Sequence, residues 1–386
     1  MSKIINKIIR FAKKQYVDYK NKKDYAYCAG VFRERLIKNG IPADKPTEGE
    51  EAYVKYWQQF SKRVEPYTYR YFHTMCNNDP RIVPEDIANR YIESVLNPKR
   101  YRGFYADKNM YGRYIQPKES VPFTWLYRVM GGLMHSMIDY GKSVIPFDIS
   151  ADELSNMIDA KVQKLVLKPS VDSNSGHGVT LFERNSGIFT SRGGGGVLSG
   201  SFLRSYGQNF VLQEAIEQHD YLKQFSTTSI NTMRIMTYRS VKDDSVLVFA
   251  ACLRIGHNGS FVDNLFSGGC FLPIDVKTGL LGKELYNRYW QTTSEMNGVD
   301  FANNEFVLPF WDKAKAFATS IALQVPHAHL LAQDIIVDSK GNPRLVEFNV
   351  DDFDWSMAMA CTHTVPFGDK FYEVIEYCLK HKNEIE

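Results

Sequence analysis

The sequence lacks long apolar runs: no stretch of about 18 or more apolar residues occurs, so no ordinary transmembrane helix is expected. The N-terminus also lacks the apolar core and small-residue cleavage site of a secretory signal peptide. The six cysteines are scattered without a CxxC pair, which favours free thiols in a reducing cytoplasm over disulfides or a zinc knuckle. The net charge is only +3 over 386 residues, so we expect no nucleic acid partner. These absences predict a cytoplasmic globular protein.

The positive charge is concentrated in the first 23 residues. This segment holds eight Lys or Arg and one Asp, a net +7, so the remaining chain carries −4. Apolar side chains recur there at helical spacing and form a stripe beside a basic face: Ile5, Ile8, Ile9, Ala12 and Tyr16. Two interpretations stay open. The stripe packs on the protein's own core, or residues 1–23 lie peripherally on the anionic inner face of a membrane.

A strand followed by a small-residue loop suggests a phosphate site in the middle of the chain. Residues 164–168 have the composition of a strand, residues 170–178 are mostly small, polar or Gly, and strand character resumes at residues 179–182. Such a hairpin loop can present backbone N–H groups to phosphate oxygens, and Lys168 adds a positive charge at the end of the strand. The loop is not a Walker A motif, and a plain hairpin turn is the alternative interpretation.

The C-terminal third contains a hairpin that brings acidic side chains together. Residues 331–337 and 343–350 are predicted strands on either side of a turn-rich segment. If the hairpin is symmetric about Lys340 and Gly341, Asp334 lies opposite Glu347, and alternation along the strand places Asn349 on the same face. Two adjacent carboxylates repel one another unless a cation lies between them, and Mg²⁺ bridging phosphates is the usual solution.

The opposite face of this hairpin is predicted to be apolar, with its members facing the core: Ile335, Val337, Val346 and Phe348. A one-residue change of register would separate the acids. The alternative interpretation is therefore an exposed hairpin with two solvent-facing carboxylates.

These segments, taken in chain order, resemble the ATP-grasp superfamily, and specifically the sugar-transfer-associated ATP-grasp family found with polysaccharide biosynthesis proteins. The resemblance covers about residues 101–386 and is specific as an ordered set. Its matching pieces are Asp107-Lys108, Lys168-Pro169 with residues 173–179, residues 210–214 followed by His219, the S-x-N-T-x-R segment 229–235, residues 254–256, Asp263-Asn264 with Gly268-Gly269, Gln333-Asp334, and the E-x-N segment 347–349. After Asn349 the sequence departs from the family pattern, because residues 350–355 are acidic where a glycine-rich segment is expected.

The resemblance implies an α+β ATP-grasp fold, in which two α+β subdomains clasp ATP, preceded by a mainly helical N-terminal region. We expect a helical accessory region at residues 1–100 with a basic amphipathic first helix. Residues 101–230 would form the N-terminal part and the small lid subdomain, and residues 231–386 the C-terminal subdomain with the metal site. The implied cofactors are ATP and Mg²⁺, with two ions and with Mn²⁺ as a substitute.

The site residues carried over by the resemblance fall into three groups. The nucleotide-binding group is Lys108, Lys168, Ser175, Gly176, Gly178, Val179, Gln213, Glu214, Ile216 and Asp220. The metal-binding group is Asp334, Glu347 and Asn349. The catalytic group is Arg234, Arg254 and Asn231, in which the arginines suit a carboxylate or an acyl phosphate.

We therefore expect a Mg-ATP-dependent ligase that joins a carboxylate to an amine through an acyl phosphate, in the biosynthesis or modification of cell-surface polysaccharide. The substrates would be a small-molecule or glycan-precursor carboxylate and an amine. A kinase that phosphorylates a hydroxyl of a sugar-like substrate is the alternative, followed by a non-catalytic nucleotide-binding scaffold of a polysaccharide assembly complex. Neither substrate can be named from the sequence, and no oligomeric state follows from it.

Overall fold

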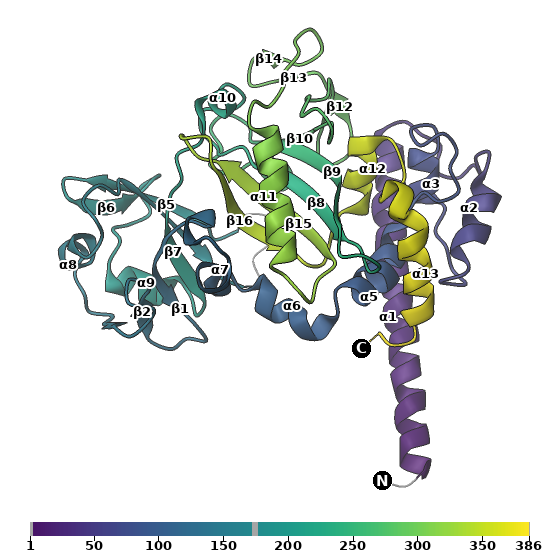
Figure 1. Ribbon diagram of the computed structural model, residues 1–386, viewed down its shortest axis with the longest axis horizontal. Helices are drawn as coiled ribbons and strands as arrows, with labels where there is room; N and C mark the ends of the chain where they lie inside the picture. The colour runs from purple at the N-terminus through teal and green to yellow at the C-terminus, as the bar shows by residue number, and fades with distance from the viewer. Residues whose placement is uncertain (1–2, 172–176, 386) are drawn as a thin grey trace.

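The computed structural model describes residues 3–171 and 177–385, apart from the side chains of residues 3–14 and 16–18. Helices make up the N-terminal region, and two seven-stranded sheets follow. The helices are α1 (Lys3–Lys38), α2 (Glu50–Trp57), α3 (Tyr67–Phe72), α4 (Glu85–Ile87), a π-helical turn η1 (Ala88–Glu93), α5 (Ser94–Leu96), α6 (Lys99–Ala106) and α7 (Lys108–Tyr114). Figure 1 shows α1 projecting beyond the body of the molecule toward the N-terminus.

The first sheet is called the smaller sheet, because its seven strands contain fewer residues in all than those of the second. It is antiparallel, and its strands lie in the order β3-β2-β1-β7-β4-β5-β6. Its strands are β1 (Thr124–Arg128), β2 (Met134–Ser136), β3 (Val144–Ile145), β4 (Lys164–Pro169), β5 (Thr180–Asn185), β6 (Ile188–Ser191) and β7 (Phe210–Glu214). Helices α8 (Ala151–Asn156) and α9 (Gly200–Tyr206) bury its apolar face in a separate small core. The predicted hairpin around the small-residue loop is confirmed, because β4 pairs with β5 in antiparallel register.

The larger sheet is also antiparallel and runs in the order β12-β11-β10-β9-β8-β15-β16. Its strands are β8 (Met233–Arg239), β9 (Val246–Ile255), β10 (Cys270–Pro273), β11 (Leu285–Tyr286), β12 (Thr292–Thr293), β15 (Leu330–Val337) and β16 (Pro343–Asn349). A separate two-stranded ribbon joins β13 (Glu295–Met296) to β14 (Val299–Asp300). Two sheets with helices on their faces agree with the expected α+β ATP-grasp architecture.

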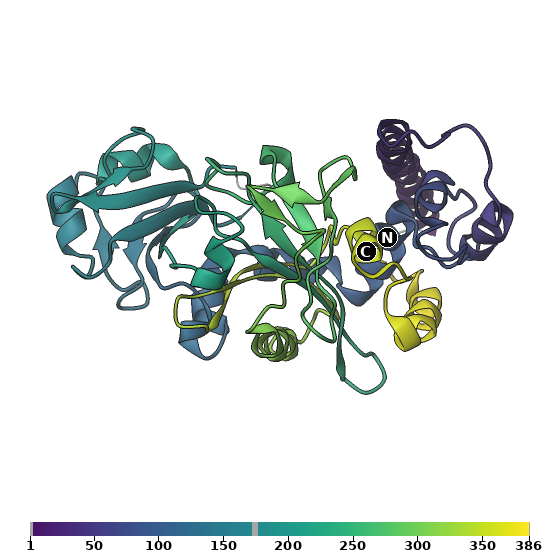
Figure 2. The ribbon, with the colours of Figure 1, turned by 90° about the horizontal axis from the view of Figure 1, so that it is seen from above.

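The larger sheet is covered by helices on both faces, which separates two cores. Helix α11 (Trp311–Leu323) packs on one face. The other face is covered by α12 (Trp355–Thr362) and α13 (Phe371–His381), together with the N-terminal helices. Figure 2 shows α12 lying between this sheet and the N-terminal helices, with α13 to one side. Side chains such as Trp57, Phe72 and Trp355 are fully buried in one shared core. The N-terminal helices are therefore packed onto the C-terminal half of the chain.

The C-terminal part of the first helix packs on the protein itself. Phe32 and Leu36 are almost fully buried, and α1 contacts α3 and α4. The predicted apolar stripe at residues 5–16 lies outside the described side chains. No helix among the described residues is long and apolar enough to cross a membrane.

The β15–β16 hairpin has the predicted register at the acids and a bulge beside them. Asp334 pairs with Glu347, but the next pair is Ile335 with Leu345, so Val346 is the extra residue of a β-bulge. The predicted core position of Val346 is therefore wrong: Leu345 takes that place and is fully buried, while Val346 lies on the wall of a cleft. The bulge keeps Glu347 and Val346 on the cleft side without disturbing the pairing of Asp334.

Candidate functional site

A cleft lies between the two sheets and receives side chains from both. On the smaller-sheet side it is lined by Lys108, Pro122, Val166, Lys168, Val179 and residues 213–216. On the larger-sheet side it is lined by Ile230, Thr232, Arg254, residues 261–264, Asp334, Ile336, Val346 and Glu347. Apolar side chains therefore form part of both walls, and the charged groups meet between them.

Two lysines face this cleft from neighbouring segments. Lys168 is the penultimate residue of strand β4, and its ammonium group lies 3.4 Å from the carbonyl oxygen of Val346 across the cleft. Burial, followed by repulsion from Lys108, lowers the pKa of Lys168 to about 8. Lys108 begins helix α7, and its backbone N–H donates to the Ser170 carbonyl at 2.9 Å. This backbone bond holds the start of α7 against the end of β4, which brings the two lysines together.

The two carboxylates of the hairpin are each held by cations. Glu347 forms an ion pair with Lys108 at 2.8 Å. Asp334 accepts two hydrogen bonds from Arg234, both at 2.9 Å, and one from Arg254 at 3.0 Å. Arg234 on β8 lies directly opposite Asp334 on β15, so the sheet register alone creates this pair. Burial acts to raise the pKa of Asp334, but the two guanidinium groups outweigh it and hold that pKa below its usual value.

A third carboxylate fixes the position of Arg254. Asp263 lies 3.3 Å from the Arg254 guanidinium and accepts from the backbone N–H of Thr232 at 2.9 Å. The Thr232 hydroxyl also donates to Asp263. Burial raises the pKa of Asp263, and Arg254 opposes that shift. Arg254 is thus held between two carboxylates, with its side chain 12% exposed on the cleft. Asp263 lies in one of the segments that resemble the family, but its role could not be predicted from the sequence, because its partners lie elsewhere in the chain.

The far end of the cleft is apolar and bordered by the end of β7. Gln213 is buried and donates to the Thr124 hydroxyl at 3.0 Å, which ties β7 to β1. The Glu214 N–H donates to the Phe123 carbonyl, and the Ala215 N–H donates to the Lys164 carbonyl, both within the smaller sheet. Ile216 follows on the cleft wall, opposite apolar residues of the larger sheet.

Nine of the residues predicted from the sequence line this cleft. They are Lys108, Lys168, Val179, Gln213, Glu214, Ile216, Arg254, Asp334 and Glu347. Ser175 and Gly176 lie outside the described residues. Gly178 is exposed beside the cleft, where the Tyr206 hydroxyl donates to its carbonyl and its φ of +77° favours glycine.

Like Gly178, four further predicted residues lie off the cleft lining: Asp220, Asn231, Arg234 and Asn349. Asp220 is exposed and pairs with Lys223 at 2.8 Å, away from the cleft lining, and its nucleotide contact stays a prediction. The fully buried amide of Asn231 donates to the Leu222 carbonyl at 2.8 Å, which makes it a brace for a neighbouring loop. Arg234 lies behind Asp334 and supports it.

Asn349 ends β16, where it pairs with Ala332 two residues beyond Glu347. The donor set formed by Asp334, Glu347 and Asn349 consists of carboxylate and amide oxygens, and such hard donors fit Mg²⁺. No group of three His, Cys, Asp or Glu side chains with metal-binding spacing occurs in the described residues. The set can therefore hold Mg²⁺ only with the help of oxygens from a ligand, which is the usual arrangement for Mg²⁺ bound with phosphates.

A second cavity of about 1320 Å³ is larger but contains none of the predicted site residues. It lies beside the start of β9 and is lined by residues 245–249, 273–284 and 361–370 among others. Its lining is mostly apolar, and the charged residues on it, such as Lys277, Lys283 and Glu284, belong to none of the predicted motifs. We therefore place the candidate site in the cleft between the sheets.

The chain is similar to known proteins in sequence and in fold. The profile of the family described as sugar-transfer associated ATP-grasp matches residues 88–364. No curated protein matches the sequence. Among solved structures, a D-alanine–D-alanine ligase from Bacillus anthracis is similar over 73% of this chain and 70% of its own, with 12% identity and a TM-score of 0.38. The biotin carboxylase domain of a 2-oxoglutarate carboxylase from Hydrogenobacter thermophilus, in complex with MgADP, is similar over 78% of this chain and 51% of its own, with 10% identity and a TM-score of 0.40.

The buried charge cluster generates a stability prediction. Asp334→Ala should lower the free energy of unfolding by about 3–5 kcal/mol, because Arg234 and Arg254 keep their charge without their shared partner. Urea denaturation followed by circular dichroism measures this loss. Asp220→Ala is the matched control, and its stability should equal that of the unmodified protein because Asp220 is fully exposed. Equal stability of the two variants would contradict the assignment.

Proposed function

This chain belongs to the sugar-transfer-associated ATP-grasp family, and we propose that it is a Mg-ATP-dependent ligase that joins a carboxylate to an amine. One observation carries the proposal. Two lysines, an arginine and two hairpin carboxylates meet in a single cleft between two antiparallel sheets, with apolar walls beside them. This combination suits a nucleotide, whose base is apolar and whose phosphates are anionic.

The nucleotide would lie with its base between the apolar walls near Ile216 and with its phosphates toward Lys108 and Lys168. The burial that lowers the pKa of Lys168 makes an anionic partner favourable, because phosphate oxygens restore the charged ammonium. Asp334, Glu347 and Asn349 would hold Mg²⁺ beside the phosphates. When bound, Mg²⁺ neutralises phosphate charge that would otherwise repel an incoming carboxylate.

The proposed reaction has two steps. An oxygen of the substrate carboxylate attacks the γ-phosphorus of ATP and ADP leaves, which forms an acyl phosphate. The amine nitrogen then attacks the acyl carbon, inorganic phosphate leaves, and the nitrogen loses a proton. Arg254 is the cleft arginine, and its planar guanidinium suits the substrate carboxylate and the acyl phosphate. Arg234 lies off the cleft lining and would contribute by holding Asp334 in place.

The alternative kinase reaction on a hydroxyl benefits from a base that accepts the hydroxyl proton. On the larger-sheet wall, the carboxylates Asp263, Asp334 and Glu347 are each engaged with a cation. A paired carboxylate is a poor base, because the neighbouring cation stabilises its ionised form. These three carboxylates are therefore poorly suited to act as the base of a kinase, which leaves Glu214 as the remaining carboxylate among the described residues of the cleft lining. The family description further suggests that one substrate is an acid or amine on a sugar-like precursor of a cell-surface polysaccharide.

Trapping with hydroxylamine tests the proposed reaction type. The protein, Mg-ATP and a set of uronic and amino acids are incubated with hydroxylamine, which intercepts acyl phosphates as hydroxamates. Formation of a hydroxamate together with ADP and phosphate is expected for the ligase. ADP accompanied by a stable phosphorylated product, with no hydroxamate for any acid, would support the kinase instead.

Replacing Glu347 tests the metal assignment. Glu347→Gln keeps the shape of the side chain but removes one charge of the proposed Mg²⁺ site, so magnesium-dependent ATP turnover should be lost while the fold persists. Turnover is followed as ADP release, and folding by circular dichroism. A folded variant with ordinary turnover would refute the role of Glu347, and Glu183→Gln on the smaller sheet serves as a control.

The pKa of Lys168 predicts a pH-dependent nucleotide affinity. Its pKa of about 8 lies below the usual 10.5, and bound phosphate stabilises the charged form, so binding takes up a proton once the pH exceeds about 8. Affinity for ATP should then fall as the pH rises above 8, by up to about tenfold per pH unit. Calorimetric titrations at pH 7, 8 and 9 measure this slope. Lys168→Met should bind more weakly at pH 7 and lose the slope, whereas an unchanged slope would exclude Lys168 as its source.

A further inference from the structure

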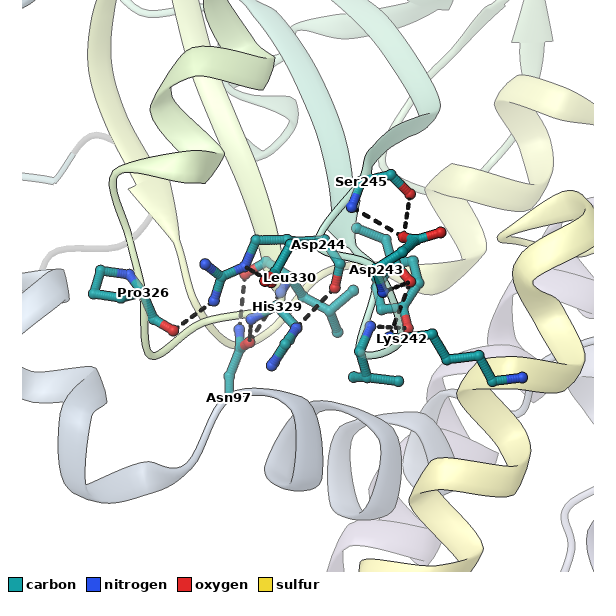
Figure 3. A network of polar contacts seen from close by, with 12 residues as sticks. Asn97, Lys242, Asp243, Asp244, Ser245, Pro326, His329 and Leu330 are labelled. Carbon is teal, nitrogen blue, oxygen red and sulfur yellow. Dashed lines mark hydrogen bonds and ion pairs between the residues drawn. The ribbon is translucent and has the colours of Figure 1, made fainter.

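Asn97 connects the N-terminal helices to both strands of the acidic hairpin. It is 2% exposed and lies directly after α5. Its side-chain oxygen accepts from the N–H groups of His329 and Leu330, at 2.9 and 3.0 Å. Its side-chain nitrogen donates to the carbonyls of Leu330 and Val350, both at 2.8 Å. Figure 3 shows Asn97 reaching from the helical region to His329 and Leu330.

These contacts fall at the ends of the strands that carry the proposed metal ligands. Leu330 is the first residue of β15, four residues before Asp334. Val350 directly follows Asn349, the last residue of β16. One buried amide therefore fixes the start of one strand relative to the end of the other, and four hydrogen bonds define that separation.

Glu93 holds the segment that follows. It is 1% exposed and is the last residue of the π-helical turn η1. Its carboxylate accepts from the N–H of Asp352 at 3.0 Å, the N–H of Phe353 at 3.1 Å and the indole N–H of Trp355 at 2.8 Å. A π-helical turn shifts the helix register by one residue and is frequent at functional sites. Here it directs a buried carboxylate at three donors from a region about 260 residues away in sequence.

The segment held by Glu93 has an unfavourable backbone conformation. Asp352 and Asp354 have φ angles of +51° and +56°, which side chains other than glycine rarely adopt. Such conformations persist only where the surroundings fix them, and they cluster at active sites. Arg102 adds a further link through its ion pair with Asp351 at 3.4 Å. The helical region thus imposes the path of the chain immediately after Asn349.

Strand β16 depends on these links because it is the edge strand of the larger sheet. Strand pairing with β15 holds only one of its sides, and this pairing is interrupted by the bulge at Val346. The other bonds to its backbone come from side chains in the middle of the strand, from the Tyr111 hydroxyl to Phe348 and from Lys168 to Val346, and leave its end to other partners. An edge strand with a bulge can shift its end more easily than a central strand. A shift of Glu347 or Asn349 by about 1 Å is enough to impair a metal site.

We propose that Glu93 and Asn97 are positioning residues that hold Glu347 and Asn349 at the correct distance from Asp334 for binding a divalent cation. This inference rests on the proposed function, since it presupposes the cation site of the hairpin. It assigns a task to the N-terminal helical region, which carries no chemical motif of its own. The helices act as an external brace for the edge strand.

The test compares two buried carboxylates of the helical region. Glu93→Gln keeps the shape but places an amide N–H against the Asp352 N–H. Glu65→Gln is the matched control, because Glu65 is fully buried and accepts from the N–H groups of Tyr67 and Thr68, at 2.7 and 3.1 Å. Those partners all lie within the helical region. Both variants should lose similar stability in thermal melts.

The readout is binding of Mn²⁺ in the presence of ADP, followed by the paramagnetic resonance of free Mn²⁺, so that no turnover is needed. Glu93→Gln should bind Mn²⁺ about tenfold more weakly, as changes to residues that orient metal ligands usually do. Glu65→Gln should bind like the unmodified protein. Hydrogen exchange should be faster at residues 350–355 in Glu93→Gln alone.

Asn97→Asp provides a second variant if Glu93→Gln does not fold. It keeps the acceptor for His329 and Leu330 but places an oxygen against the Val350 carbonyl, so Mn²⁺ affinity should fall in the same direction. Equal Mn²⁺ affinity of Glu93→Gln and Glu65→Gln, at equal stability, would overturn the brace. Absence of Mn²⁺ and ADP binding by the unmodified protein would instead reject the proposed cation site, which separates the two failures.

Discussion

The arrangement of the cleft depends on the double clamp of two arginines on Asp334. A buried carboxylate is costly unless its charge is compensated and its oxygens accept hydrogen bonds. Arg234 and Arg254 supply both, the first from β8, which lies next to β15, and the second from β9, which lies one strand further away. The clamp has a second consequence, because Asp263 balances the second guanidinium and brings its own loop to the cleft wall. The position of one carboxylate thus determines the geometry of three strands and a loop.

Local reasoning predicted the hairpin but missed its irregularity. The opposition of Asp334 and Glu347 followed from a short turn and strand alternation, and the register confirms it. The bulge could not be predicted, because one extra residue changes neither the composition nor the turn, and it moved Val346 from the core to the cleft. The placement of Lys168 at the end of a strand before a loop was equally local, and it is likewise confirmed.

Contacts between distant segments could not be derived from the sequence in the same way. Asp220 and Asn231 entered the predicted site through motif order, yet the structure gives them a surface ion pair and a buried brace. Asp263 appeared in a matching motif without a role, and Asn97 had no local signal, because each depends on partners that lie 9 to 253 residues away in the chain. The role of a buried Asn or Asp can be recognised only once its burial is known, because that role depends on the hydrogen-bond donors whose bonds the side chain accepts.

One requirement links the charge pairs of the cleft to the hydrogen bonds of Glu93 and Asn97: the carboxylates must stay in place while their partners change. In the free protein, the cations of the cleft are balanced by its own carboxylates: Lys108 by Glu347, and the arginines by Asp334 and Asp263. Lys168 differs from these cations, because burial and the nearby charge of Lys108 make its charged form less favourable than it would be in water. A polyanion with a bound divalent cation restores the balance on both sides at once, since its phosphates engage the lysines while the cation engages the carboxylates.

Such an exchange of partners succeeds only if the carboxylates keep their positions while their partners change, and an edge strand with a bulge cannot ensure that by itself. The buried hydrogen bonds from Glu93 and Asn97 provide the missing rigidity, which explains why a helical region without chemical motifs is packed against the C-terminal half of the chain.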